Sequence, residues 1–128
     1  MGYYFGATID STFEDAIDKV TAELKKEGFG IITDIDVKET LQEKLSVEFR
    51  NYRILGACNP QYAYKALQAE SKIGAMLPCN VVVQERETGG IEVSAIDPVA
   101  SMLAVRNDDL QAIARKIQEK LQKVIESL

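Results

Sequence analysis

The sequence predicts a two-layer α+β sandwich, with an about five-stranded, mostly antiparallel sheet and helices packed on one of its faces. Three observations support this fold class. Several short segments alternate apolar and polar residues with the two-residue period of a strand. Two long segments instead carry apolar stripes with the spacing of an amphipathic helix. Their order along the chain, mainly β-α-β-β with a hairpin, is typical of a two-layer α+β sandwich.

Length and composition indicate one domain that spans residues 1–128. The chain has 128 residues, of which 46% are hydrophobic and 27% charged, a balance typical of a small globular domain. Its apolar runs are too short for a membrane-spanning helix, and no secretory signal opens the sequence, so we expect a cytoplasmic protein without a membrane partner. A net charge of −5 argues against nucleic acid as a partner. The absence of histidine removes the commonest general base and metal ligand.

The first half of the chain predicts two strands and two helices. Residues 3–9 alternate as a half-buried strand, and residues 13–27 form a helix that Ser11 or Thr12 caps and Gly28 ends. Residues 29–36 form a second strand, which places Phe29, Ile31, Thr33 and Ile35 on one face. Asp36, followed three residues later by Glu39, is typical of the start of a short helix over residues 37–44.

The second half predicts three strands and two main helices. Residues 47–58 read as a strand whose alternation slips near Arg50 and Asn51, which indicates a bulge. Asn59 and Pro60 form a cap-and-proline start to a helix that runs to about residue 71. Residues 81–97 form a hairpin about a Thr-Gly-Gly turn, Asp97 and Pro98 open a short helical segment, and the last helix follows Asn107.

One face of the predicted sheet has no predicted helix to cover it. The side chains expected there form a mixed polar and apolar set, namely Tyr4, Thr8, Ile32, Asp34, Tyr52 and Val82. Such a face is either partly hydrated or packed against a second subunit. The sequence therefore leaves a homodimer as the expected assembly.

The only two cysteines, Cys58 and Cys79, are each followed directly by asparagine. Cys58 precedes the predicted helix cap, where the positive end of the helix favours a thiolate, whereas an alternative reading packs it as a small core residue. Cys79 follows Pro78 and precedes three valines, which favours simple burial. Asn59 and Asn80 can serve as cap and strand-entry residues, or their amides can line a polar pocket together.

The sequence does not decide how far apart the two Cys-Asn motifs lie in the fold. A parallel crossover through the helix after Asn59 would place Cys58 and Cys79 at opposite ends of the sheet, about 15 Å or more apart. The segment of residues 72–77 is, however, long enough to bring the chain back along that helix. Only the second arrangement would unite the thiols.

Read in order, "GFGIITDIDVKETLQEKL", "YRILGACNP", "IGAMLPCNVVV" and "VSAIDP" resemble the proteins catalogued as domain of unknown function 302. The similarity covers nearly the whole chain. It implies a small α+β fold of the TATA-box-binding-protein-like class, often dimeric, in bacteria and archaea. It implies no established activity, so the function has to be argued from the residues.

We predict a small-ligand-binding or interaction module whose site draws on six residues: Cys58, Asn59, Cys79, Asn80, Tyr52 and Asp97. Two alternatives remain open. One is a thiol-dependent enzyme or redox protein with Cys58 as the attacking group and Cys79 resolving it, and the other is a structural homodimer without a small-molecule site. The sequence leaves any cofactor unknown, and no metal site is predicted, because two thiols fall short of a zinc set. Monovalent copper is the least unfavourable metal for such a pair.

Overall fold

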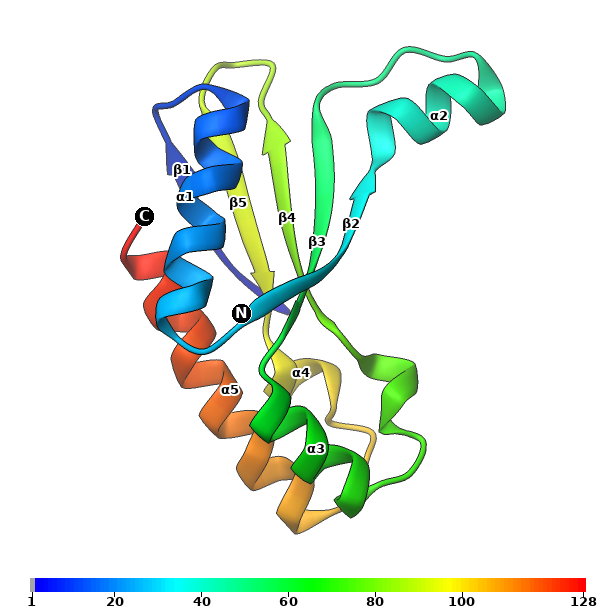
Figure 1. Ribbon diagram of the computed structural model, residues 1–128, viewed down its shortest axis with the longest axis vertical. Helices are drawn as coiled ribbons and strands as arrows, with labels where there is room; N and C mark the ends of the chain where they lie inside the picture. The colour runs from blue at the N-terminus through cyan, green and yellow to red at the C-terminus, as the bar shows by residue number, and fades with distance from the viewer. Residues whose placement is uncertain (1) are drawn as a thin grey trace.

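The computed structural model describes residues 2–128 and contains one antiparallel five-stranded sheet (Figure 1). The strand order is β1-β5-β4-β3-β2, and each neighbouring pair is antiparallel. The strands are β1 (Tyr4–Ile9), β2 (Gly30–Asp36), β3 (Tyr52–Cys58), β4 (Cys79–Glu85) and β5 (Ile91–Ile96). The predicted α+β class and the predicted number of strands are confirmed.

Helices cover one face of this sheet, as predicted. The chain forms helices α1 (Phe13–Lys26), α2 (Val37–Leu45), α3 (Pro60–Ala69), α4 (Pro98–Ser101) and α5 (Asp108–Glu126), with a 3₁₀ helix η1 (Ile73–Met76). Figure 1 shows α1 and α5 side by side along the sheet, whereas α3 and α4 lie beyond one end of it. None of the described helices is long and apolar enough to cross a membrane.

The core consists of two clusters of buried side chains. The larger cluster fills the space between the sheet and helices α1 and α5, and includes Val20, Leu24, Val81, Val93 and Leu121. The smaller one lies where α3, η1 and α4 pack on the start of α5, and consists of Ala66, Ile73, Met102, Leu110 and Ala114. Ile113 of α5 packs against both clusters, so the boundary between them runs beside this residue.

Two predictions about strand geometry were wrong. Residues 47–51 lie outside the sheet, because β3 begins only at Tyr52. The irregularity expected near Arg50 and Asn51 occurs instead in β2, where the register shifts between Ile31 and Thr33. One extra residue in a strand turns every following side chain to the opposite face.

This shift redistributes the side chains of β2. Asp34 pairs with buried Leu55 and thus lies on the helix-covered face, where Arg53 donates hydrogen bonds to both of its carboxylate oxygens. Ile35 pairs with Ile54 and lies on the opposite face, which we call the open face. Asp34 was expected on that open face and Ile35 on the covered one, so both assignments are corrected.

Helix α2 projects from the layers at the end of the sheet away from α3 and α4 (Figure 1). None of its residues is buried, although Asp36 caps it as predicted by accepting a hydrogen bond from the backbone of Glu39. Leu45 at its end and Val47 after it are exposed, at 65% and 43%. The helix therefore gains little stability from packing within this chain.

Candidate functional site

The two cysteines lie at the same end of the sheet. Strands β3 and β4 are antiparallel neighbours, and Ala57, directly before Cys58, is the pairing partner of Cys79. The segment after α3 turns back through η1, which is the second of the two arrangements that the sequence allowed. Both thiols are free.

An apolar cavity of about 290 Å³ lies around these strand ends, between the two core clusters. Among its lining residues, polar side chains come only from Asn59 and the two cysteines. The remaining lining residues are Phe29, Ile32, Ala57, Ala63, Ala66, Leu67, Gly74, Leu77, Pro78, Met102, Leu110, Ile113 and Ile117. The cavity is therefore suited to a small compound with a mostly apolar surface.

Burial decides the chemistry of Cys79. Its side chain is only 6% exposed, and burial, with a smaller contribution from the nearby Cys58, raises the pKa of the Cys79 thiol to about 11. This thiol is protonated at neutral pH. Cys58, by contrast, is half-buried and is the more accessible of the two.

Asn59 is the cap residue of α3, but its side chain does not perform the predicted capping hydrogen bond. Its amide Nδ2 instead donates to the backbone carbonyl of Glu27 at 3.1 Å, at the end of α1. The next residue, Gly28, has a positive φ of 88°, and a Cβ there would lie 3.1 Å from this Nδ2 atom. Asn59 thus joins the end of α1 to the start of α3 and also forms part of the cavity wall.

Asn80 and Tyr52 lie away from this cavity. Both line a shallow groove of about 280 Å³ on the open face, together with Tyr4, Val82 and Ile96 among others. The reason is strand alternation, because Asn80 follows the inward-facing Cys79 and must point to the opposite face. The first Cys-Asn motif therefore lies wholly at the cavity, whereas the second is divided between the cavity and the open face.

Asp97 lies at a third place and has a structural environment. It is 6% exposed and caps α4 by accepting hydrogen bonds from the backbones of Val99 and Ala100, at 3.0 and 3.4 Å. Gln118 of α5 donates to the same carboxylate at 3.1 and 3.3 Å. Of the six predicted site residues, the fold therefore places Cys58, Asn59 and Cys79 at the cavity, Asn80 and Tyr52 at the groove on the open face, and Asp97 apart from both.

Sequence reasoning missed most of the cavity wall. Small side chains on α3 and η1, at Ala63, Ala66 and Gly74, leave room that larger residues would fill, and Met102 closes another side. The available signal was alanine at positions 63 and 66 of a segment otherwise read as an ordinary amphipathic helix, and glycine at position 74. These small residues indicate a cavity only when the residues that lie opposite them are known.

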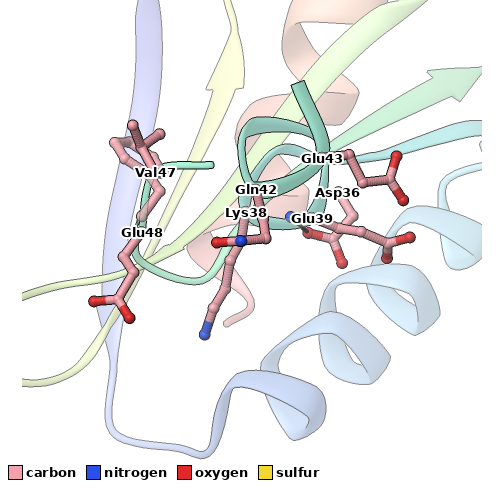
Figure 2. A pocket seen from close by; sticks show the side chains of 8 residues that line it. Asp36, Lys38, Glu39, Gln42, Glu43, Val47 and Glu48 are labelled. Atoms are coloured by element: carbon pink, nitrogen blue, oxygen red, sulfur yellow. Dashed lines mark hydrogen bonds between the residues drawn. The ribbon is translucent and has the colours of Figure 1, made fainter. Parts of the chain in front are cut away.

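A larger groove, of about 660 Å³, lies beside α2 (Figure 2). Its lining includes four carboxylates, from Asp36, Glu39, Glu43 and Glu48, together with Lys38 and Gln42. Figure 2 shows these side chains spread along the helix and the following segment rather than converging on one point. Within residues 2–128 no group of three or more His, Cys, Asp or Glu side chains is placed to hold a metal ion.

Comparisons with known proteins identify a family but no activity. No curated protein matches this chain. A solved structure described as "uncharacterized conserved protein DUF302 from Bacillus stearothermophilus" is similar over 98% of both chains, with 28% sequence identity and a TM-score of 0.90. The family model described as "Domain of unknown function DUF302" matches residues 5–128. The chain therefore belongs to the DUF302 family, as its motifs predicted.

Proposed function

We propose that this protein is a small-molecule-binding module whose ligand occupies the cavity between the two core clusters. The observation that carries the proposal is an apolar space of about 290 Å³ that also contains two thiols and one amide. Sites for drug-sized ligands are typically about 300–1,000 Å³ and mainly apolar, so this ligand is expected to be smaller. The few polar groups would orient it at the Cys58 and Asn59 side.

A variant that fills the cavity tests the proposal. Gly74 lies in the cavity wall without a positive φ, and a Cβ built there meets only Leu67, at an ordinary 3.9 Å. Gly74→Leu is therefore expected to fold and to occupy part of the space. The matched control is Ala75→Leu, because Ala75 follows Gly74 in the same 3₁₀ helix but is exposed and lies outside the cavity lining.

The measurement is binding of small apolar aromatic probes, such as naphthol and indole, by ligand-observed NMR and calorimetry. We expect at least tenfold weaker binding for Gly74→Leu and unchanged binding for Ala75→Leu. Equal binding by both variants, or no probe bound by the wild-type protein, contradicts the proposal.

A second candidate is a thiol-dependent enzyme or redox protein, which the accessibility of Cys58 at this cavity favours. With the pKa of Cys79 raised to about 11 by burial, Cys58 is the residue we would assign as the nucleophile. Iodoacetamide labelling across pH, with the site located by mass spectrometry, tests this. A native protein that resists labelling at Cys58 excludes it.

We further propose a cytoplasmic homodimer that binds neither nucleic acid nor membrane. Free thiols suit a reducing compartment, and a net charge of −5 repels phosphate groups. The open face supports the choice of a second copy as partner, because it exposes Tyr4 and Ile35 at 50% and 48%. If the protein is instead a structural homodimer without a small-molecule site, the same open face would form the dimer interface.

A further inference from the structure

Asn59 and Asp97 are the two buried residues among residues 2–128 whose side chains carry nitrogen or oxygen, at 9% and 6% exposed. Both oxygens of Asp97 accept hydrogen bonds within the protein. Asn59 differs, because its Nδ2 donates to the carbonyl of Glu27 whereas its Oδ1 accepts no hydrogen bond from the described residues. A buried acceptor of this kind needs a donor from water or from a ligand.

Asn107 shows the same arrangement with its oxygen occupied. Its Nδ2 donates to the carbonyl of Ala69 at the end of α3, at 2.9 Å, and its Oδ1 accepts from the backbone of Leu110, at 3.1 Å. Both asparagines thus join two helices through Nδ2, but the oxygen of Asn59 caps no helix. The junction between α1 and α3 therefore explains the nitrogen of Asn59 and not its oxygen.

The oxygen of Asn59 is accessible to a bound molecule. Every fully buried side-chain nitrogen or oxygen in the described part of the chain has a partner, so Oδ1 is not sealed within the protein. The amide borders both the cavity and a charged surface hollow that includes Gly28 and Lys120. Its nitrogen is the atom nearer to Gly28, since a Cβ there would lie 3.1 Å from Nδ2 and 3.7 Å from Oδ1. The oxygen therefore lies on the cavity side of the amide.

The rest of the cavity wall selects against charged groups. None of its lining residues is a lysine, arginine, aspartate or glutamate. Burial raises the pKa of the Cys79 thiol to about 11, so this thiol is also neutral at neutral pH. A charged group beside Asn59 would lose its hydration without gaining a countercharge, which is costly. A neutral hydroxyl or N–H group needs only the acceptor that Oδ1 supplies.

We propose that the cavity binds small, neutral, mainly apolar molecules that carry a hydroxyl or N–H group, and that Asn59 Oδ1 accepts a hydrogen bond from this group. This inference rests on the proposed function and narrows its ligand class. It excludes carboxylates, and it disfavours ketones, esters and ethers, because these groups only accept. The carbonyl of Glu27 can bond only the nitrogen of the amide, so the α1–α3 junction fixes which end faces the ligand.

The test compares indole with benzofuran, two molecules of nearly equal size and shape, by calorimetry and ligand-observed NMR on the full chain. Indole has an N–H donor where benzofuran has an oxygen. We expect indole to bind at least fivefold more tightly, although its donor costs more to desolvate. Naphthoate, which is a carboxylate at neutral pH, should bind at least tenfold more weakly than naphthol.

Asn59→Ala removes the acceptor and should abolish the preference for indole over benzofuran. The matched control is Asn107→Ala, which also removes a hydrogen bond between two helices but lies outside the cavity lining, and should keep the preference. Because the two affinities are compared within each variant, a loss of stability that weakens both ligands does not change their ratio. Circular dichroism shows which variants fold, and the wild-type comparisons decide alone if Asn59→Ala does not.

Equal or tighter binding of benzofuran by the wild-type protein overturns this inference and leaves the cavity as a ligand site. An unchanged preference in Asn59→Ala, or naphthoate binding as tightly as naphthol, overturns it equally. Failure of every probe to bind would overturn the proposed function as well.

Discussion

Gly56 lies in a crowded part of β3, where only hydrogen fits at the Cα position. A Cβ there would overlap Thr33 Oγ1 from β2 and would lie 2.7 Å from Pro78 Cγ. Because the Thr33 side chain and the Pro78 ring would both have to shift, we expect Gly56→Ala to lower the free energy of unfolding by about 1–3 kcal/mol. Denaturant unfolding measures this change.

Gly30→Ala is the control for this prediction, because it adds the same atom to a neighbouring strand where nothing lies within 4 Å. It should change stability by less than about 0.5 kcal/mol. Adding Thr33→Ala to Gly56→Ala should recover part of the loss. Equal stability of the two glycine variants would mean that the contacts around Gly56 are looser than described.

The buried thiol of Cys79 leads to a prediction about how the unfolding free energy depends on pH. Its folded-state pKa of about 11 lies above the ordinary value of 9.0, so the folded protein holds this proton more tightly than the unfolded chain. This contribution to the unfolding free energy is complete below pH 9 and is lost as the pH rises towards 11. At about 1.4 kcal/mol per pKa unit, the loss amounts to about 3 kcal/mol. The unfolding free energy of the wild type should therefore fall more steeply over this range than that of Cys79→Ala. Parallel curves would show that Cys79 does not contribute.

At the scale of the elements, helix caps were predictable because they depend on residues close in sequence. Thr12, Asp36, Asp97 and Asn107 each accept a backbone hydrogen bond at the start of the helix that follows. Asn59 is the exception, because Glu27, distant in sequence, provides a competing acceptor for its amide. A local sequence pattern indicates where a helix begins, but it does not indicate which group forms a hydrogen bond with the side chain of the cap residue.

The two aspartate caps should differ in their effect on stability. Asp97 is buried and joins α4 to Gln118 of α5, whereas Asp36 caps the exposed α2. We expect Asp97→Ala to cost about 2–4 kcal/mol, because it also leaves the half-buried Gln118 amide without its partner. Asp36→Ala should cost about 1 kcal/mol. Thermal and denaturant unfolding of both variants would show the difference, and similar losses would contradict it.

At the scale of the whole molecule, the proposed homodimer can be tested on the open face. Ile35→Glu places a charge on this face, and we expect it to weaken self-association at least tenfold because a charge would have to be buried at the interface. Leu103→Glu is the control, since Leu103 is exposed at 70% and lies in the segment after α4. Sedimentation equilibrium measures both. A wild-type protein that remains monomeric, or equal effects of the two variants, argues against this interface.

The sequence alone determined the fold class, most element boundaries, most of the helix caps and the family, because these depend on periodicity and on neighbouring residues. Only the tertiary structure decided which candidate residues meet. Antiparallel pairing of β3 with β4 brought Cys58 and Cys79 together, while alternation sent Asn80 to the opposite face. The shift in β2 reversed the faces of Asp34 and Ile35. Pairing register and the filling of space between distant segments arise from contacts that no local pattern contains, so the cavity became visible only in three dimensions.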